Sequence, residues 1–487
     1  MLPYRSLIQL NRKGDIALYI QVCNSFITLI TNGTLQPSDT LPGSRILAEL
    51  IGINRNTVKL AYEELISQGW AESIERKGVF VLSRLPLRSK NLTTETGKNN
   101  ISQEAFIWTN DFEHVTPGKN FQNTTLAIDA GFPDVRLAPV DLLMREYRSL
   151  SRRFHGRNFL KYGSSKGSER LRVAICNYLS NTRGLNISAE NIIITKGSQM
   201  GIYLAAQLLI SPGDHVAVGV SNYGFADDTF RYSGANLVRI PVDGKGMDID
   251  YLEEVLTHKK IKAVYVIPHH HFPTTVTMST ERRLKLLNLA KEYHFAIIED
   301  DYDFDFHYDN KPYLPLASID HNQNVIYIGS ISKTFAPALR IGFMTGPSAF
   351  VNATSYLREL IDKQGDTLLE EAFAVMFNDG EMERHFRKSL KIYKQRRDFF
   401  CRLLGTDFKD EIEFKVPEGG LAVWANFDQK IDLIKLSDEA AKKGLHIEDS
   451  TFYQNESFSP NALRLGFASL NENEIVEALG VLKNVMP

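Results

Sequence analysis

The sequence is poor in the residues and patterns that mark several classes of protein. Among 487 residues there are three cysteines, Cys23, Cys176 and Cys401, and none belongs to a CxxC pair. This excludes a disulfide framework and a thiolate zinc site, and it suits the reducing cytoplasm, where we expect the protein to act. No apolar run approaches the ~18 residues of a membrane span. The first residues also lack a long apolar segment after a basic start, so we expect no signal peptide.

The chain also lacks a large excess of either positive or negative charge, because its formal net charge is only −2. The charge is unevenly distributed, however. Residues 1–90 contain 11 Lys and Arg against 7 Asp and Glu, which leaves the rest of the chain acidic. A mildly basic head on an acidic body permits a nucleic-acid-binding module at the N-terminus.

The first 82 residues show the pattern of a winged helix-turn-helix. Apolar spacing predicts a helix over 17–32, a short helix from Ser44 as its N-cap to Gly52, and a third helix that Asn54 caps and that runs to about residue 68. Two β-like runs around a charged turn with Gly78 then predict a hairpin. The alternative is a small structural or dimerisation domain.

The polar residues of this head suit contact with double-stranded DNA. A recognition helix meets base edges with its first turns, and wing or flanking cations suit phosphate or the minor groove. The predicted DNA-binding residues are Arg45, Arg55, Asn56, Thr57, Lys59 and, in the wing, Lys77.

Two further segments follow the head. Residues 83–125 contain sixteen Ser, Thr or Asn and keep no helical or strand period, which predicts a flexible linker. Residues 126–487 alternate continuous apolar runs with longer helical patterns, which predicts an α/β domain with a mostly parallel sheet covered by helices on both faces. From about residue 375 the pattern indicates a smaller C-terminal α+β subdomain.

The predicted strand ends carry one consistent set of polar groups. Lys196-Gly197-Ser198-Gln199 opens a helix and suits a phosphate group, Asp300, Asp301 and Tyr302 follow a second strand, and Ser330-Ile331-Ser332-Lys333 follows a third, with Arg340 beyond it. Ligands bind at the carboxyl ends of strands in such sheets. Pyridoxal 5′-phosphate requires these parts: a lysine for the Schiff base, a carboxylate for the pyridine nitrogen, and an anion cradle with an arginine.

Two motif sets carry a resemblance to a known family. SISKTFAPALRIGF resembles the lysine motif of fold-type I aminotransferases, and IIEDDYDFDF resembles the acidic strand end that precedes it. With LPGSRILAELIGINRNTVKLAYEELISQGW at the N-terminus, the chain resembles the MocR subfamily of GntR-type regulators, which join a winged helix-turn-helix to an aminotransferase-like domain. The resemblance covers nearly the whole chain except the linker.

The resemblance implies a role for each matching residue. Lys333 would form the Schiff base, Asp300 would hold the pyridinium, Tyr302 would bond the phenolic oxygen, and Tyr223 would stack on the ring. Arg464 would receive a substrate carboxylate. The phosphate cradle would comprise Gly197, Ser198, Ser330, Ser332 and Arg340, with Tyr162 reaching across a homodimer, and His271 would belong to the cofactor-binding segment.

The sequence also departs from the family pattern on the substrate side. His271 replaces a glutamine and Thr275 a glycine in the motif S-H-Q-[FY]-P-T-G, and Phe225 stands where some members place a second arginine. Structural alternatives exist beside these roles: Tyr223 in the core, and Arg464 in an ion pair. A metal site at His269–His271 is awkward on an extended strand, whose neighbouring side chains point to opposite faces, and Asp301, Asp303 and Asp305 favour a solvated edge over a cation site.

The sequence therefore predicts a transcriptional regulator that binds pyridoxal 5′-phosphate and a DNA operator as a homodimer. Its aminotransferase-like domain would sense a small amino compound, or the cofactor itself, through aldimine formation. The alternative is a catalytically active aminotransferase with an appended DNA-binding domain.

Overall fold

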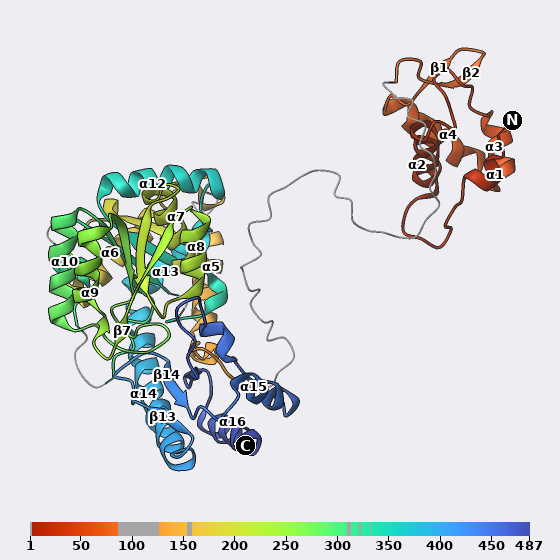
Figure 1. Cartoon of the computed structure of the whole chain (residues 1–487). Helices are drawn as coiled ribbons and strands as arrows, with labels where there is room; N and C mark the ends of the chain where they lie inside the picture. The colour runs from red at the N-terminus through yellow and green to blue at the C-terminus, as the bar shows by residue number, and fades with distance from the viewer. Residues whose placement is uncertain (1, 86–125, 153–157, 309–312, 321–322, 332) are drawn as a thin grey trace. The chain divides into compact units, whose positions relative to one another are not determined.

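A computed structural model describes residues 2–85, 126–152, 158–308, 313–320, 323–331 and 333–487 of the chain (Figure 1). The chain divides into two units, Met1–Trp108 and Thr109–Pro487, and each is described by itself. Most of the linker predicted at 83–125 lies outside the described residues, as does Ser332.

The N-terminal unit has the element order of a winged helix-turn-helix, as predicted. Apolar side chains on one face of each helix, among them Phe26, Leu47, Val58 and Leu65, form one buried core. Tyr62 packs on Phe26 and donates its hydroxyl proton to the Pro42 carbonyl at 2.7 Å. The elements are α1 (Tyr4–Leu7), α2 (Leu18–Thr31), α3 (Ser44–Ile51), α4 (Arg55–Ser67), β1 (Ala71–Ile74) and β2 (Gly78–Val81).

The helix caps of this unit agree with the prediction at one helix and differ at the other. Asn54 caps α4 by accepting a hydrogen bond from the Asn56 amide at 2.8 Å. Ser44 does not cap α3: it is the first helical residue, and Gly43 occupies the cap position without a side-chain bond. The Ser44 hydroxyl instead accepts a hydrogen bond from Arg55 Nε at 3.4 Å, which joins the starts of the two helices.

The second unit is built on a seven-stranded sheet with the order β4-β12-β11-β10-β9-β5-β6. Only β12 runs antiparallel to its neighbours, so the mostly parallel sheet of the prediction is confirmed. The strands are β4 (Ile192–Thr195), β5 (His215–Gly219), β6 (Asn236–Ile240), β9 (Ile261–Val266), β10 (Ala296–Asp301), β11 (Val325–Ser330) and β12 (Gly342–Thr345).

Helices cover both faces of this sheet because consecutive strand residues point to opposite sides. Ile297 and Tyr327 belong to the cores beneath one layer of helices, whereas Ile298 and Ile328 belong to the core on the opposite face. The first layer contains α5 (Val140–Arg152), α6 (Glu169–Arg183), α9 (Ile249–His258), α10 (Thr280–Tyr293) and α13 (Thr367–Asn378); the second contains α7 (Ser198–Leu209), α8 (Gly224–Tyr232) and α12 (Ser348–Ile361). A hairpin, β7 (Val242–Asp243) and β8 (Gly246–Met247), and the short α11 (Leu316–Ile319) complete the large part.

The C-terminal part forms a smaller α+β subdomain with its own core, as expected. This subdomain also uses a segment that sequence reading assigned elsewhere, because β3 (Leu126–Ile128) pairs with β15 (Leu445–Ile447). The start of the second unit thereby packs against its end. The remaining elements are α14 (Glu381–Asp407), β13 (Ile412–Phe414), β14 (Ala422–Phe427), α15 (Leu433–Lys442), a short 3-10 helix η5 (Ser450–Tyr453), β16 (Ala462–Gly466) and α16 (Glu472–Val485).

Candidate functional site

A cavity of about 290 Å³ opens where the strand ends of the large sheet meet the small subdomain. Strands β10 and β11 bring their carboxyl ends to the same edge of the sheet, and β16 contributes from the small subdomain. Most of the residues predicted to bind the cofactor and substrate are gathered here. The lining includes Ser198, Tyr223, Asp300, Tyr302, Ser330, Lys333, Arg340 and Arg464.

Asp300 presents a buried carboxylate with one unused oxygen. Its Oδ2 accepts the hydroxyl proton of Tyr265 at 2.8 Å, while Oδ1 is buried without a hydrogen-bond partner among the described residues. Burial raises the pKa of Asp300 to about 7, and the charges of Asp301 and Asp303 act in the same direction. A buried acceptor that lacks a donor fits the protonated nitrogen of a pyridine ring.

The amine of Lys333 is buried and has a lowered pKa. Its Nζ donates to the Gly131 carbonyl at 2.9 Å and lies 3.7 Å from the centre of the Phe132 ring. Burial lowers the pKa of Lys333 to about 8, while the Asp129 carboxylate opposes that shift. A lysine with such a pKa is partly unprotonated near neutral pH, which is the state that attacks a carbonyl group.

The start of α7 and Arg340 form a cradle for an anion. Gly197 has φ +78, and a Cβ atom at this position would overlap the Arg340 guanidinium. The backbone of Arg340 also lies in the left-handed region, with φ +51, and its Nη2 donates to the Lys196 carbonyl at 2.7 Å. Ser198 and Ser330 line the cavity beside them. The N-terminus of α7, the two serine hydroxyls and the Arg340 guanidinium together suit a phosphate group.

Arg464 is a buried cation whose hydrogen bonds go to uncharged groups. It is 1% exposed, and it donates to the carbonyls of Ala130 at 2.9 Å and Pro273 at 3.0 Å and to the Tyr302 hydroxyl at 3.2 Å. Among the described residues, Arg464 therefore forms no ion pair, in contrast to the structural alternative considered for it. A guanidinium that is buried without an acidic partner fits the carboxylate of a ligand.

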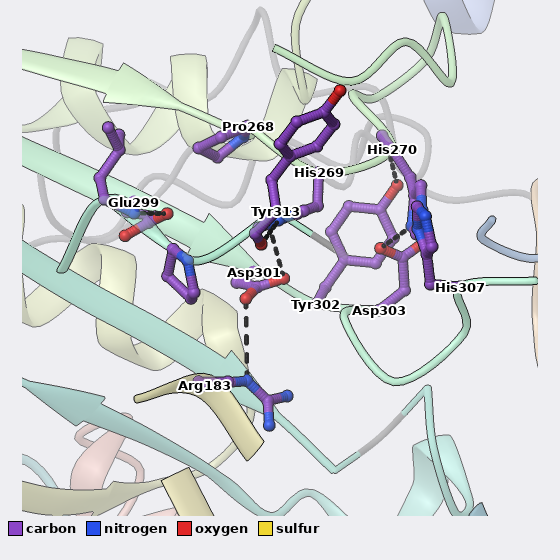
Figure 2. Close-up of polar contacts among 12 residues, drawn as sticks. Arg183, Pro268, His269, His270, Glu299, Asp301, Tyr302, Asp303, His307 and Tyr313 are labelled. Atoms are coloured by element: carbon purple, nitrogen blue, oxygen red, sulfur yellow. Dashed lines mark hydrogen bonds and ion pairs between the residues drawn. The ribbon is translucent and has the colours of Figure 1, made fainter. Parts of the chain in front are cut away.

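The hydroxyl group of Tyr302 has two protein partners. It donates to the His270 carbonyl at 2.7 Å (Figure 2), and it accepts from Arg464. Its expected bond to the phenolic oxygen of the cofactor stays a prediction and requires one of these partners to be exchanged or shared.

Aromatic rings form the walls of the cavity. Tyr223 lies at the start of α8 with its ring 5.7 Å from that of Phe225 and 5.6 Å from that of Phe272. Burial raises the pKa of Tyr223 to about 12, so its phenol is neutral. All three residues line the cavity, which places Tyr223 beside the ligand space as well as against the core.

The expected solvated edge at Asp301, Asp303 and Asp305 is wrong. Asp301 and Asp303 are 2% and 1% exposed, and the Asp305 side chain is mostly buried. Asp301 accepts from the Tyr327 hydroxyl at 2.6 Å. It also lies 3.9 Å from Arg183 Nε (Figure 2). Arg183 also pairs with Asp305 at 3.2 Å. The segment continues a central strand into the interior, and a buried cation balances its charges.

The histidine run adopts a different conformation from the extended strand assumed for it. Strand β9 ends at Val266, and His270 has φ +42. Each ring has its own partner. His269 meets the Tyr313 carbonyl at 2.6 Å and His270 meets Asp303 at 2.9 Å (Figure 2). His271 meets the Thr274 hydroxyl at 2.8 Å. No metal-binding group of three or more His, Cys, Asp and Glu side chains occurs among the described residues.

Three predicted cofactor residues in the described parts of the chain are not in the cavity lining: Gly197, which lies against Arg340, His271 and Tyr162. His271 is 5% exposed, and burial lowers its pKa to about 3, so its ring is neutral and packed. Tyr162 is 87% exposed, as a residue that serves a second subunit would be before assembly. All three roles stay predictions, and Ser332 lies outside the described residues.

Sequence reading missed several lining residues and one that supports the site. Gln199 follows Ser198 directly and belongs to the same helix start, so the motif itself was a signal. Phe132, Glu448 and Phe452 enter the cavity from segments without any recognisable pattern. Tyr265, which holds Asp300, sits within an apolar strand and gave no sign of its role.

In the N-terminal unit, the predicted DNA-binding side chains lie on the surface of α3, α4 and the wing. Arg45, Arg55, Asn56, Lys59 and Lys77 are exposed, and Thr57 is half-buried. Val58, Ala61 and Leu65 of α4 are buried in the core. The polar face of α4 is therefore free to enter a groove of DNA.

No helix in the described parts of the chain is long and apolar enough to cross a membrane.

Comparisons with known protein families match both units. The family described as "Aminotransferase class I and II" matches residues 134–482, and the family "Bacterial regulatory proteins, gntR family" matches residues 18–81.

Individual relatives divide in the same way. The chain is 31% identical to aromatic-amino-acid aminotransferase 1 of Thermococcus litoralis over 360 residues, 73% of this chain and 86% of that protein. It is 25% identical over 480 residues, 98% of this chain, to the probable rhizopine catabolism regulatory protein MocR of Rhizobium meliloti, of which it covers 95%. Among solved structures, kynurenine aminotransferase of Pyrococcus horikoshii, in a complex with PMP, superimposes with a TM-score of 0.68 at 30% identity, covering 74% of this chain and 90% of that one.

Proposed function

We propose that the cofactor site of this protein controls its binding to DNA. The chain belongs to the class I and II aminotransferase family, and it joins that domain to a gntR-family helix-turn-helix in the MocR-type arrangement. The protein is a GntR-type regulator with a pyridoxal-phosphate-dependent aminotransferase-like domain. A small amine binds at this domain, and its binding changes the affinity of the N-terminal helix-turn-helix for a DNA operator. One observation carries this proposal: Lys333, Asp300 and Arg464 share one cavity in a chain that also presents a polar recognition helix.

The residues present fit pyridoxal 5′-phosphate. Asp300 offers a buried oxygen that lacks a donor, and the Gly197–Arg340 contact leaves no room for a side chain on residue 197. When bound, the cofactor supplies an aldehyde that condenses with primary amines and a ring that withdraws electrons once its nitrogen is protonated. Lys333, Asp300, Tyr223, Ser198, Ser330 and Arg340 would hold it.

The protein's own groups set the protonation states in the cavity. The lowered pKa of Lys333 keeps part of its amine neutral, and Asp300, held by Tyr265, would hold a proton on the pyridine nitrogen of a bound cofactor. Because a positive partner favours the carboxylate form, the pKa of Asp300 will fall once that partner is bound.

Arg464 orients the ligand through its carboxylate. Its three described bonds go to neutral oxygens, so an arriving carboxylate supplies the opposite charge that the interior lacks. Aromatic walls exclude water and strengthen that ion pair.

Control of DNA affinity requires two states of the whole protein. A ligand that exchanges with Lys333 frees that side chain, and it alters operator affinity only if the two states hold the heads differently. We propose a C₂ homodimer, in which Tyr162 of one subunit serves the cofactor of the other and two heads bind repeated half-sites.

The test uses the full-length protein loaded with cofactor and a labelled DNA fragment from upstream of its own gene. We expect an amine that changes the cofactor's absorption band also to change the operator affinity, measured by fluorescence anisotropy. The Lys333→Ala variant should bind the fragment without responding to the amine. Equal DNA affinity at all amine concentrations would contradict the proposed control.

A second candidate function is transamination, favoured by the 31% identity to an aminotransferase and by the cavity that Lys333, Asp300 and Arg464 share. An assay with several amino donors and 2-oxoglutarate distinguishes the two. Rapid turnover together with no operator near the gene would favour the enzyme.

A further inference from the structure

Two charged side chains in the cavity remain after the cofactor contacts are assigned. The described lining contains five charged residues, and Asp300, Lys333 and Arg340 belong to the cofactor. Arg464 and Glu448 are left to contact a ligand. One is a cation and the other an anion, so the free part of the cavity is itself bipolar.

Glu448 is a buried carboxylate that lacks a close cation. It follows β15 and is 9% exposed. Its ionic neighbour among the described residues is His446, with Nε2 at 3.8 Å from Oε1, which is too far for a hydrogen bond. A carboxylate taken out of water in this way is costly unless a cation joins it.

Glu448 and Arg464 act on a common group without pairing with each other. The Tyr453 hydroxyl is buried, and both charges act on it. Burial raises its pKa most, Arg464 lowers it, and Glu448 raises it. Arg464 and Glu448 line the same cavity of about 290 Å³, so one small ligand can contact both.

The walls near these charges also suit an organic cation. Phe132, Phe225 and Phe452 line the cavity and remain 36%, 37% and 41% exposed. Aromatic faces attract ammonium and guanidinium groups, and the Lys333 amine already lies 3.7 Å from the Phe132 ring centre. Phe225 adds no positive charge, so nothing described there would receive a second carboxylate.

We infer, building on the proposed function, that the ligand is an amino acid with a second cationic group, such as a diamino monocarboxylic acid. Its carboxylate pairs with Arg464, and its side-chain cation pairs with Glu448 against the aromatic wall. A dicarboxylic amino acid would bring a negative charge to Glu448, and a neutral side chain would leave that carboxylate unpaired.

The experiment titrates the cofactor-loaded full-length protein with L-ornithine, L-lysine, L-norleucine and L-2-aminoadipate. The readouts are the cofactor absorption band and the shift in melting temperature. We expect ornithine or lysine to bind about tenfold or more tightly than norleucine, the ratio that one charge-assisted hydrogen bond provides. This ranking is measured on the unaltered protein and so does not depend on whether a variant folds.

Variants then assign the preference to Glu448. Glu448→Gln should remove the advantage of the diamino acid over norleucine. Glu439→Gln, which alters an exposed carboxylate paired with Lys442, should leave every affinity as it was. Norleucine or aminoadipate binding as tightly as lysine, or a Glu448→Gln protein that keeps the preference, would overturn the inference while the proposed function stands. If no amine changes either readout, the proposed function itself fails.

Discussion

At the scale of single residues, burial separates side chains that are neighbours in the sequence. Asp300 faces the cavity with an unpaired oxygen, whereas Asp301 accepts from Tyr327 and lies near Arg183. The two carboxylates share a strand and a residue type, yet one serves the ligand and the other the interior. Substitutions at these positions should therefore affect different properties.

Asp300→Asn should weaken cofactor binding, and Asp301→Asn should weaken the fold. Loss of a charge-assisted bond to the cofactor predicts an increase in Kd of about tenfold or more for Asp300→Asn. Removal of the charge beside Arg183, which keeps its pair with Asp305, predicts a loss of about 1–3 kcal/mol in the free energy of unfolding for Asp301→Asn. Absorbance titration with the cofactor and denaturant unfolding measure the two effects, and a reversed result would contradict the assignment of Asp300.

The rate of cofactor incorporation into the apoprotein should rise with pH around a midpoint near 8. The pKa of Lys333 is lowered by burial to about 8, so its amine is charged and inactive below that pH and neutral above it. The rate should therefore increase from pH 7 to 9 and then level off, as measured by stopped-flow absorbance. Asp300→Asn should keep this midpoint, which separates it from the titration of Asp300. A midpoint near 10.5, the ordinary pKa of lysine, would contradict the lowered pKa of Lys333.

At the scale of elements, helix starts determine where ligands bind. The start of α7 meets Arg340 only because Gly197 has no side chain, and Asn54 begins α4 so that its first turn carries polar residues outward. The backbone at the start of α7 thus positions a predicted phosphate site, and the cap of α4 positions the predicted DNA-binding side chains.

Gly197→Ala should lower cofactor affinity beyond its effect on stability. A Cβ atom would strain a backbone with φ +78 and displace Arg340. Gly213→Ala is the matched control, because Gly213 has φ +90 and no atom within 4 Å of a built Cβ. We expect both variants to lose about 1 kcal/mol of stability from backbone strain and only Gly197→Ala to lose affinity for the cofactor. Equal cofactor binding by the two variants would show that the Gly197–Arg340 contact is not part of the phosphate cradle.

Arg55→Ala and Lys77→Ala should weaken DNA binding in different ways. Arg55 begins the recognition helix, and its loss should cost about 1–3 kcal/mol and relax specificity at one base. Lys77 lies in the wing, and its loss should weaken binding to all sequences alike and reduce the salt slope by about 1. Anisotropy titrations over a range of salt and operator variants distinguish the two, and an unchanged specificity for Arg55→Ala would exclude a base contact.

At the scale of the whole molecule, the second unit closes its site with both ends of its chain. Strand β3 from the start of the unit pairs with β15 near its end, and the small subdomain delivers Arg464 and Glu448 to the strand ends of the large sheet. One predicted contributor, Tyr162, points to solvent instead. A second copy of the chain would account for it.

The protein should sediment as a homodimer, and Tyr162→Ala should raise the Kd for the cofactor several-fold. The matched control is Tyr356→Ala, because Tyr356 is also strongly exposed, at 72%, and is not part of the described cavity lining. Sedimentation velocity and cofactor titration of both variants provide the measurement. A monomer with full cofactor occupancy would contradict both the dimer and the role of Tyr162.

The sequence by itself determined the winged helix-turn-helix, the mostly parallel sheet and the lysine, aspartate and arginine at its strand ends. These follow from local periodicity and from the convergence of parallel strand ends, which require no knowledge of packing. Tertiary structure alone decided that Asp301 and Asp303 are buried, that Tyr265 holds Asp300, and that Glu448 faces the ligand space. Those outcomes depend on which distant segments pack together. Burial and pairing are properties of that packing and leave no mark on the residue types around each position.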